Sequence, residues 1–250
     1  MYTLKKSLGQ HFLKDENVCK RIVAELLKHD FTHLLEVGPG GGALTKYLIE
    51  IPAISFTAVE LDEEKVNYLL SAFPSLHGKI LTKSILEIDP PFAEPFALIG
   101  NFPYNISTQI LFKVLEWRMQ IDCVIGMFQK EVAQRIAAPE GNKVYGVTSV
   151  LTQAYFDVIY LFEVNENSFD PPPKVKSSVI KLLPRKEALD VKSDRAFFNL
   201  VKTAFQQRRK TLRNACRSLF DTQTLQQDIF NKRPEQLSVQ DFARLSFDLK

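Results

Sequence analysis

The chain has 250 residues, of which 45% are hydrophobic and 24% are charged, and its net charge at neutral pH is +3. This composition is typical of a globular protein and excludes a disordered, collagenous or repeat protein. We expect a cytoplasmic protein without a metal. No apolar run has the length of a membrane span, the amino terminus lacks a signal-peptide core, and three cysteines without clustered histidines support neither a disulfide framework nor a zinc site.

The basic residues are concentrated in one part of the chain. Residues 1–173 contain 15 basic and 21 acidic side chains, and residues 218–250 contain 4 and 5. Residues 174–217 contain 13 basic and 3 acidic side chains, a net charge of +10. Such a concentration favours a nucleic acid partner, with a solvated helix face as the alternative.

Predicted strands and helices alternate through the first part of the chain. An early helix is indicated by helical spacing from Val18 to Leu27. Further helices are predicted at 43–50, 62–73 and 107–117, and strands at 33–38, 54–61, 79–84, 96–100, 121–128, 156–164 and 177–183. Asp62 and Ser107 are the expected helix caps. Because parallel strands need crossover connections, the alternation predicts an α/β fold, a mostly parallel sheet with helices on both faces.

After Pro184 the pattern contains helices only, predicted at 193–205, 208–219 and 238–246. We therefore predict a first domain of residues 1–185 and a small helical domain of residues 186–250. Basic residues at a spacing of four predict a stripe along one face of the middle helix, and Leu212, Cys216 and Leu219 are expected on another face, against the core of the small domain. A rigid basic stripe suits structured RNA, which presents phosphates and 2′-hydroxyls. The predicted RNA-binding residues are Arg208, Arg209, Lys210, Arg213 and Arg217.

A glycine-rich loop, EVGPGGGALT, lies between the first predicted strand and the helix after it. Gly38, Gly40 and Gly42 permit positive φ angles and close approach of a ligand to the backbone. Glu60 ends the next strand, where a carboxylate can accept hydrogen bonds from both ribose hydroxyls. The pair indicates an adenosine-containing cofactor. A dinucleotide remains possible because Ala43 completes the looser G-x-G-x-x-A pattern, and a simple tight turn is the structural alternative.

The motif NFPY, residues 101–104, follows the predicted strand FALIG. The Asn101 side chain and the Phe102 carbonyl are hydrogen-bond acceptors that can hold the two hydrogens of an adenine N6 amine. Pro103 would constrain them, and Tyr104 would stack on the base. Taken alone, these four residues fit a proline turn with buried aromatics equally well.

Several separated motifs resemble the ribosomal RNA adenine dimethyltransferase family, in particular its members that act on the small ribosomal subunit. They are SLGQHFL, EVGPGGG, NFPY, FQKEVAQRI, FDPPPKVKSSV and QQRRKTLRN, and the similarity runs from about Lys5 to about Leu219. The resemblance implies a Rossmann-like class I S-adenosylmethionine-dependent methyltransferase sheet followed by a small all-helical domain. It implies dimethylation of N6 of two adjacent adenosines near the 3′ end of 16S rRNA during ribosome biogenesis.

The resemblance also assigns site residues. The target-base pocket falls on Asn101–Tyr104 and on Phe169, whose following prolines favour a stiff segment. Ser84 stands where the family usually has an Asp that accepts a hydrogen bond from the cofactor's adenine; Glu87 and Asp89 would need a shift of register. The implied cofactor contacts are His11, Leu13, Gly38, Gly40, Glu60, Leu61, Ser84 and Asn101.

Four alternatives accompany this interpretation. They are a large-subunit rRNA adenine-N6 methyltransferase, a DNA adenine methyltransferase, a non-catalytic rRNA-binding assembly factor or transcription factor of the same fold, and a nicotinamide-dependent oxidoreductase. The expected cofactor is S-adenosylmethionine. The expected partner of a monomeric enzyme is 16S rRNA, within the small subunit or its precursor, and no membrane.

Overall fold

The computed structural model describes residues 11–250, so Ser7–Gln10 of the first motif lie outside the described residues. The chain divides into two compact units. Unit 1 contains the chain up to Ala133 together with Ile159–Pro184, and unit 2 contains Gln134–Val158 together with Arg185–Lys250. The predicted division at residue 185 leaves residues 134–158 with the first part, whereas these residues cluster with the carboxyl-terminal helices.

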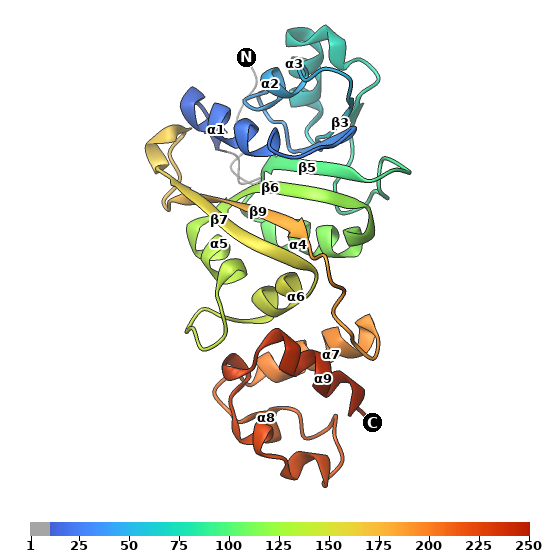
Figure 1. Cartoon of the computed structure of the whole chain (residues 1–250). Helices are drawn as coiled ribbons and strands as arrows, with labels where there is room; N and C mark the ends of the chain where they lie inside the picture. The colour runs from blue at the N-terminus through green and yellow to red at the C-terminus, as the bar shows by residue number, and fades with distance from the viewer. Residues whose placement is uncertain (1–10) are drawn as a thin grey trace. The chain divides into compact units, whose positions relative to one another are not determined.

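The sheet of unit 1 has seven strands in the order β4-β3-β2-β5-β6-β9-β7 (Figure 1). The strands are β2 (His33–Val37), β3 (Ser55–Val59), β4 (Ile80–Leu81), β5 (Phe96–Asn101), β6 (Ile121–Gln129), β7 (Phe156–Val164) and β9 (Ser177–Pro184). Pairing is parallel from β4 to β6, and β9 is antiparallel to β6. The predicted mostly parallel α/β sheet is confirmed. Strand β4 is shorter than predicted because its partner β3 ends at Val59, which pairs with Leu81.

A second, two-stranded sheet pairs β1 (Phe12–Leu13) with β8 (Phe169–Asp170), with Leu13 opposite Phe169. The sequence analysis did not predict it. Strands of two residues carry no alternating pattern that could reveal them.

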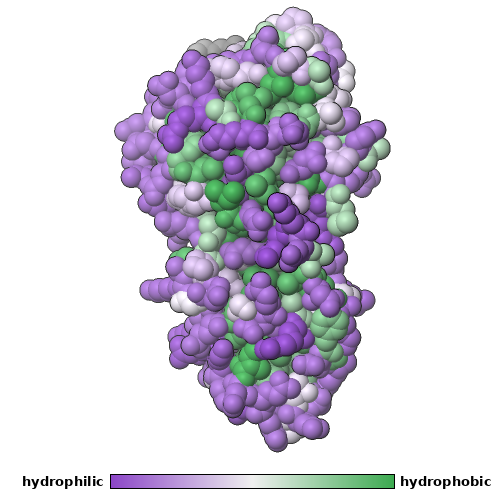
Figure 2. All heavy atoms as spheres, in the orientation of Figure 1, coloured by the Kyte–Doolittle hydropathy of each residue, from purple (hydrophilic) through white to green (hydrophobic). Residues whose placement is uncertain are grey.

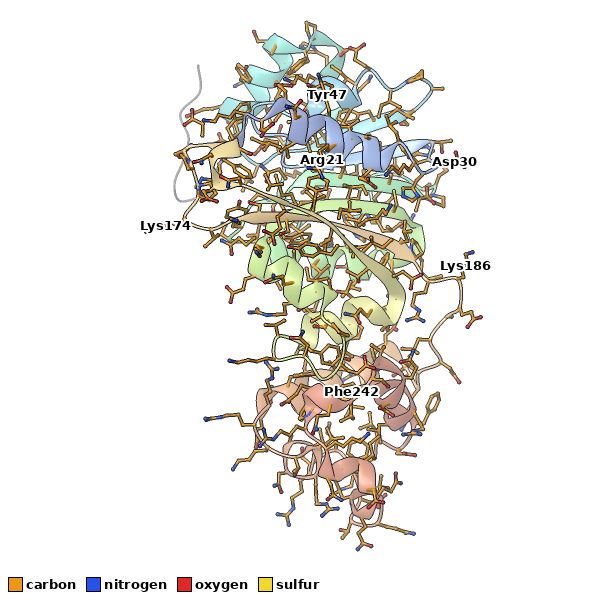
Figure 3. All side chains as sticks on the ribbon, turned by 60° about the vertical axis from the view of Figure 1, so that its left-hand side comes forward. Arg21, Asp30, Tyr47, Lys174, Lys186 and Phe242 are labelled. Carbon is orange, nitrogen blue, oxygen red and sulfur yellow. The ribbon has the colours of Figure 1, made fainter. Side chains whose placement is uncertain are left out.

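Helices cover both faces of the sheet, as predicted. Figure 1 shows α1 (Glu16–Leu26), α2 (Thr45–Leu48) and α3 (Glu63–Ala72) on one side and α4 (Ser107–Glu116) on the other. Helix α1 begins where the Asp15 side chain accepts hydrogen bonds from two backbone N–H groups, and its apolar face packs into the main core with the strands. On the same helix, the Arg21 guanidinium lies 3.8 Å from the centre of the Phe162 ring (Figure 3).

The two predicted helix caps have different outcomes. Asp62 caps α3 by accepting a hydrogen bond from the N–H of Glu64, as predicted. The prediction for Ser107 is wrong: the cap position is Ile106, whose carbonyl already accepts the N–H of Ile110 at 2.9 Å. The Ser107 hydroxyl instead donates to the carbonyl of Tyr104 at 3.2 Å. It therefore ties α4 back to the NFPY segment.

Unit 2 is helical. Its helices are α6 (Val147–Tyr155), α7 (Asp194–Gln206), α8 (Leu212–Ala215), α9 (Val239–Phe247) and the 3-10 turns Thr224–Gln226, Asp228–Asn231 and Pro234–Gln236, while α5 (Lys130–Ala137) joins the two units. Its core is aromatic: Phe242, labelled in Figure 3, is fully buried with its ring 5.9 Å from that of Phe205. Helices α7 and α9 confirm two of the predictions.

The predicted helix at 208–219 is wrong. Helix α8 covers only Leu212–Ala215, because Thr211 before it is extended and the N–H of Leu212 bonds the carbonyl of Lys232 at 2.8 Å rather than one a turn earlier. On the predicted apolar face, Leu212 and Cys216 are nevertheless buried, and Leu219 is half-buried. A helical period thus identified the buried residues correctly, although the local backbone is mostly turns.

Hydrophilic side chains dominate the face of the molecule drawn in Figure 2. Within residues 11–250, no helix combines the length and the apolar character needed to cross a membrane. Cys19, Cys123 and Cys216 are buried, and none of them forms a disulfide.

Candidate functional site

One cleft in unit 1 gathers most of the predicted site residues. It lies at the carboxyl ends of β2, β3 and β5, the edge at which open parallel sheets bind ligands. Phe169 is not among the residues that line it. The predicted residues that do line it are His11, Leu13, Gly38, Gly40, Glu60, Leu61, Ser84, Asn101, Phe102, Pro103 and Tyr104.

The glycine loop is compressed against its surroundings. Gly38 and Gly40 have φ angles of +68° and +58°, a region that other residues rarely adopt. At Gly42, a Cβ atom would lie 2.7 Å from the ring of Phe73. Backbone conformation therefore favours glycine at positions 38 and 40, and lack of space requires it at position 42. Gly38 and Gly40 line the cleft without side chains.

Glu60 connects the loop to the end of β3. Its side chain is nearly buried, and its two oxygens accept hydrogen bonds from the N–H groups of Gly40, at 3.1 Å, and Asp62, at 3.0 Å. Each carboxylate oxygen has a second lone pair, so these bonds leave capacity to accept hydroxyl groups of a ligand.

Glu36 is a cleft residue that the sequence analysis missed. It lies on β2 just before the glycine loop and is 1% exposed. Burial, with a smaller contribution from the charge of Glu60, raises the pKa of Glu36 to about 8, so this carboxyl is mainly neutral at pH 7. The available signal was a lone acidic residue within the otherwise apolar strand HLLEV.

Asn101 is the last residue of β5, and its amide nitrogen bonds the amino-terminal segment. Its Nδ2 donates to the main-chain carbonyl of His11 at 3.4 Å. Within the described part of the chain, no hydrogen bond to the amide oxygen is found, so that oxygen is the acceptor that the cleft offers. The ring of Phe102 is buried, and its main-chain carbonyl is the only acceptor it can contribute.

Tyr104 and His11 form an aromatic corner of the cleft. Their ring centres are 5.5 Å apart, and the Tyr104 hydroxyl lies 2.5 Å from Ser177 Oγ. Burial raises the pKa of Tyr104, which keeps the phenol neutral. His11 Nδ1 donates to the carbonyl of Pro171 at 2.8 Å, which fixes the ring.

Two predicted residues are placed differently from the others. Phe169 is fully buried in the core of unit 1, beside Leu13 across the β1–β8 pair. Ser84 lines the cleft, but its Oγ already accepts a hydrogen bond from the N–H of Leu86. The acidic alternatives Glu87 and Asp89 are not among the lining residues.

The basic residues of unit 2 do not lie on one helical face, because the chain from residue 207 to residue 211 is not helical. Arg208 is half-buried: its guanidinium donates to the carbonyls of Asn142 and Lys143 and lies 3.8 Å from Glu235. The others, Arg209, Lys210, Arg213 and Arg217, are exposed, although Arg213 Nε donates to the carbonyl of Leu225 at 2.9 Å. Figure 3 shows nitrogen-tipped side chains extending from this unit into solvent.

Comparisons with known proteins identify related sequences along nearly the whole chain. The family described as ribosomal RNA adenine dimethylase matches residues 1–247. Two bacterial proteins named ribosomal RNA small subunit methyltransferase A, from Flavobacterium johnsoniae and Cytophaga hutchinsonii, are each 50% identical over 97% of this chain and cover 94% and 95% of their own lengths.

Solved structures share the fold. A dimethyladenosine transferase from Plasmodium falciparum has a TM-score of 0.79 over 94% of this chain and 96% of its own. The 23S rRNA methyltransferase ErmE has a TM-score of 0.68 over 95% of this chain and 99% of its own. Both are 24% identical to this chain, and this likeness shows the fold alone.

The raised pKa of Glu36 predicts a pH-dependent stability. The unfolded chain releases the proton near its ordinary pKa of 4.5 and the folded protein near 8, so wild-type stability falls as pH rises between these values. In Glu36→Gln this loss is absent. We expect the free energy of unfolding of Glu36→Gln, relative to wild type, to be higher at pH 8 than at pH 5 by more than about 1 kcal/mol, measured by urea denaturation.

Comparing two pH values cancels the constant effect of an amide at this position. The matched control is Glu50→Gln, at an exposed position. An equal difference from wild type at both pH values would contradict a neutral Glu36.

Proposed function

The chain belongs to the ribosomal RNA adenine dimethylase family, and on this premise we propose that it dimethylates N6 of two adjacent adenosines near the 3′ end of 16S rRNA, with S-adenosylmethionine as methyl donor. The observation that carries the proposal is the meeting of Asn101–Tyr104 with the glycine loop and Glu60 in one cleft. A cofactor cradle and a set of hydrogen-bond acceptors for an amine are thereby adjacent. The substrate is the small subunit or its precursor, since the relatives at 50% identity are named for the small subunit.

The residues of the cleft fit an adenosine-containing cofactor. The loop at Gly38 and Gly40 offers close approach to main chain, and Glu60 can accept the ribose hydroxyls with its remaining lone pairs. His11, Leu13, Leu61 and Ser84 line the same cleft and complete the proposed cofactor contacts. When bound, S-adenosylmethionine supplies an electrophilic methyl group.

The protein's part in the chemistry is to orient the target amine. The lone pair of an adenine amine is delocalised into the ring, which makes the amine a weak nucleophile. Accepting its two hydrogens at the Asn101 amide oxygen and the Phe102 carbonyl turns the lone pair out of conjugation and toward the methyl group. The His11 carbonyl holds the Asn101 amide in the required orientation. Such preorganised polar contacts act without reorganisation during the reaction.

Tyr104 provides a neutral aromatic surface on which a base can stack. We propose Phe169 as a second wall, which requires the ring to leave its buried position in unit 1. In unit 2, we propose that the exposed Arg209, Lys210, Arg213 and Arg217 contact RNA phosphates.

The test of the function is incubation with labelled S-adenosylmethionine and either unmethylated small subunits or large-subunit RNA, followed by nucleoside analysis. We expect N6,N6-dimethyladenosine from the small subunit only. Label in the large-subunit RNA alone would indicate the other branch of the family, and label in neither would indicate a non-catalytic binding protein.

Asn101 is expected to matter more for turnover than the aromatic residues. Losing a preorganised acceptor costs about 3 to 4 kcal/mol in the chemical step, whereas losing one stacking ring costs about 1 to 3 kcal/mol. Single-turnover rates should therefore fall more in Asn101→Ala than in Tyr104→Ala or Phe169→Ala. The opposite order would overturn these roles.

Ser84→Asp is expected to tighten the binding of S-adenosylmethionine. One oxygen of an Asp can keep the hydrogen bond from the N–H of Leu86, and the other is then available to accept the adenine amine. Isothermal titration calorimetry measures the change, with Ser84→Asn as the uncharged control. No gain in affinity for Ser84→Asp would contradict a contact between residue 84 and the adenine.

Removing the exposed basic residues is expected to weaken RNA binding in a salt-dependent way. Replacing Arg209, Lys210 and Arg217 by Gln should lower affinity for small-subunit particles, and each lost phosphate contact should reduce the salt slope by about 0.7 to 0.9. Arg208→Gln should instead lower the melting temperature, because its guanidinium holds the carbonyls of the 142–143 turn. An unchanged salt slope in the triple variant would place the RNA-binding surface elsewhere.

A further inference from the structure

Phe102 occupies a space created by two glycines. Gly100 on β5 and Gly126 on β6 are directly paired across the sheet, and the buried Phe102 ring lies against both. A Cβ atom at Gly126 would lie 2.5 Å from Cε2 and 3.2 Å from Cζ of Phe102. A Cβ atom at Gly100 would lie 2.7 Å from Cε1 of the same ring.

Space, and not backbone conformation, explains the glycine at position 126. Neither Gly100 nor Gly126 has a positive φ angle. A Cβ atom at Gly100 would also lie 2.5 Å from the Val37 carbonyl oxygen. Close packing against β2 is therefore a second reason why position 100 requires glycine. At Gly126 the close neighbours are aromatic side chains only, namely Phe102 and Phe128, whose rings meet edge to face at 5.0 Å.

The Phe102 ring holds in place the backbone that carries the two proposed acceptors, the Asn101 amide oxygen and the Phe102 carbonyl. The N–H of Phe102 bonds the carbonyl of Met127 at 3.2 Å, next to Gly126 on β6. On either side of the ring's own backbone lie Asn101, held by the His11 carbonyl, and Pro103, whose ring is packed 3.6 Å from where a Cβ of Gly38 would be. Because the ring is enclosed by Gly100, Gly126 and Phe128, a group that displaces the ring also shifts the backbone that carries it.

We infer that Gly126 is a positioning residue of the methyl-transfer site. Its missing side chain admits the Phe102 ring, and the seated ring sets the Asn101 amide and the Phe102 carbonyl at the distance and angle that the target amine needs. Gly126 itself touches neither substrate nor cofactor. The inference rests on the proposed function, and displacements of about 1 Å at a reacting centre can cost about 100-fold in rate.

The test is a double-mutant cycle of wild type, Gly126→Ala, Phe102→Leu and the variant carrying both changes. Leucine lacks the Cε2 and Cζ atoms that the new methyl group would strike. The space that the shorter side chain leaves also lets the neighbouring Phe128 ring, whose Cε2 would lie 2.7 Å from the same methyl group, move away. We expect Gly126→Ala to lower kcat on small subunits at least 10-fold, with the Kd for S-adenosylmethionine changed less than 3-fold. We expect the same change to leave kcat equal or higher in the Phe102→Leu background. Gly146→Ala, where the nearest atom would be 4.0 Å away, is the control.

The cycle separates positioning from folding and from the proposed function. The melting temperatures of the four variants measure how strongly positions 102 and 126 interact in stability, and this measurement does not require an active enzyme. Unchanged kcat in Gly126→Ala overturns the inference, as does a loss of kcat that Phe102→Leu does not relieve. If Gly126→Ala fails to fold, the two variants in the Phe102→Leu background still decide: a 10-fold loss there contradicts the inference. A wild-type enzyme without methyl transfer would contradict the proposed function instead.

Discussion

Parallel pairing around β2 is the constraint on which the site depends. Strand β2 pairs in parallel with β3 on one side and β5 on the other, so all three end at the same edge. The glycine loop directly follows β2, and Glu60 directly follows β3. Asn101 is the last residue of β5. Strand pairing thereby brings together residues that are 63 positions apart, from Gly38 to Asn101. The relative positions of the reactive groups at this edge are therefore set by the sheet.

The same strand pairing brings two carboxyl groups close together in different surroundings. Glu36 is the next-to-last residue of β2 and Glu60 directly follows the adjacent β3. Burial, with a smaller contribution from the charge of Glu60, raises the pKa of the Glu36 carboxyl. Glu60 is supported by two backbone N–H donors, whereas no described residue satisfies Glu36 Oε2. One edge of the sheet thus carries a hydrogen-bonded acceptor for hydroxyl groups and a protonated carboxyl that can donate.

Much of this arrangement could be predicted from sequence because it follows from strand ends and local turns. The alternation of elements, the glycine loop and the position of NFPY all depend on short-range patterns, and the structure gathers most of the expected residues, though not Phe169, in one cleft. What could not be predicted depends on packing. Leu212 and Cys216 are buried as the helical period suggested, yet the chain around Thr211 is extended because Leu212 pairs with Lys232. Arg208 and Arg209 are both arginines, yet the Arg208 guanidinium donates a hydrogen bond to the carbonyl of Asn142, in a turn far away in the sequence.

The two-residue strands β1 and β8 extend this dependence on packing to the site itself. They join the amino-terminal contacts, His11 and Leu13, to the segment at Phe169 and Pro171. Ser168 strengthens the joint, since its carbonyl accepts the N–H of Lys14 at 2.9 Å and its hydroxyl donates to Asp15 at 3.0 Å. The residue that caps α1 is therefore also bonded to the residue before Phe169. The proposed cofactor contact Leu13 and the proposed base-stacking residue Phe169 lie opposite each other in the β1–β8 pair. A displacement of Phe169 from the core must therefore be transmitted to Leu13.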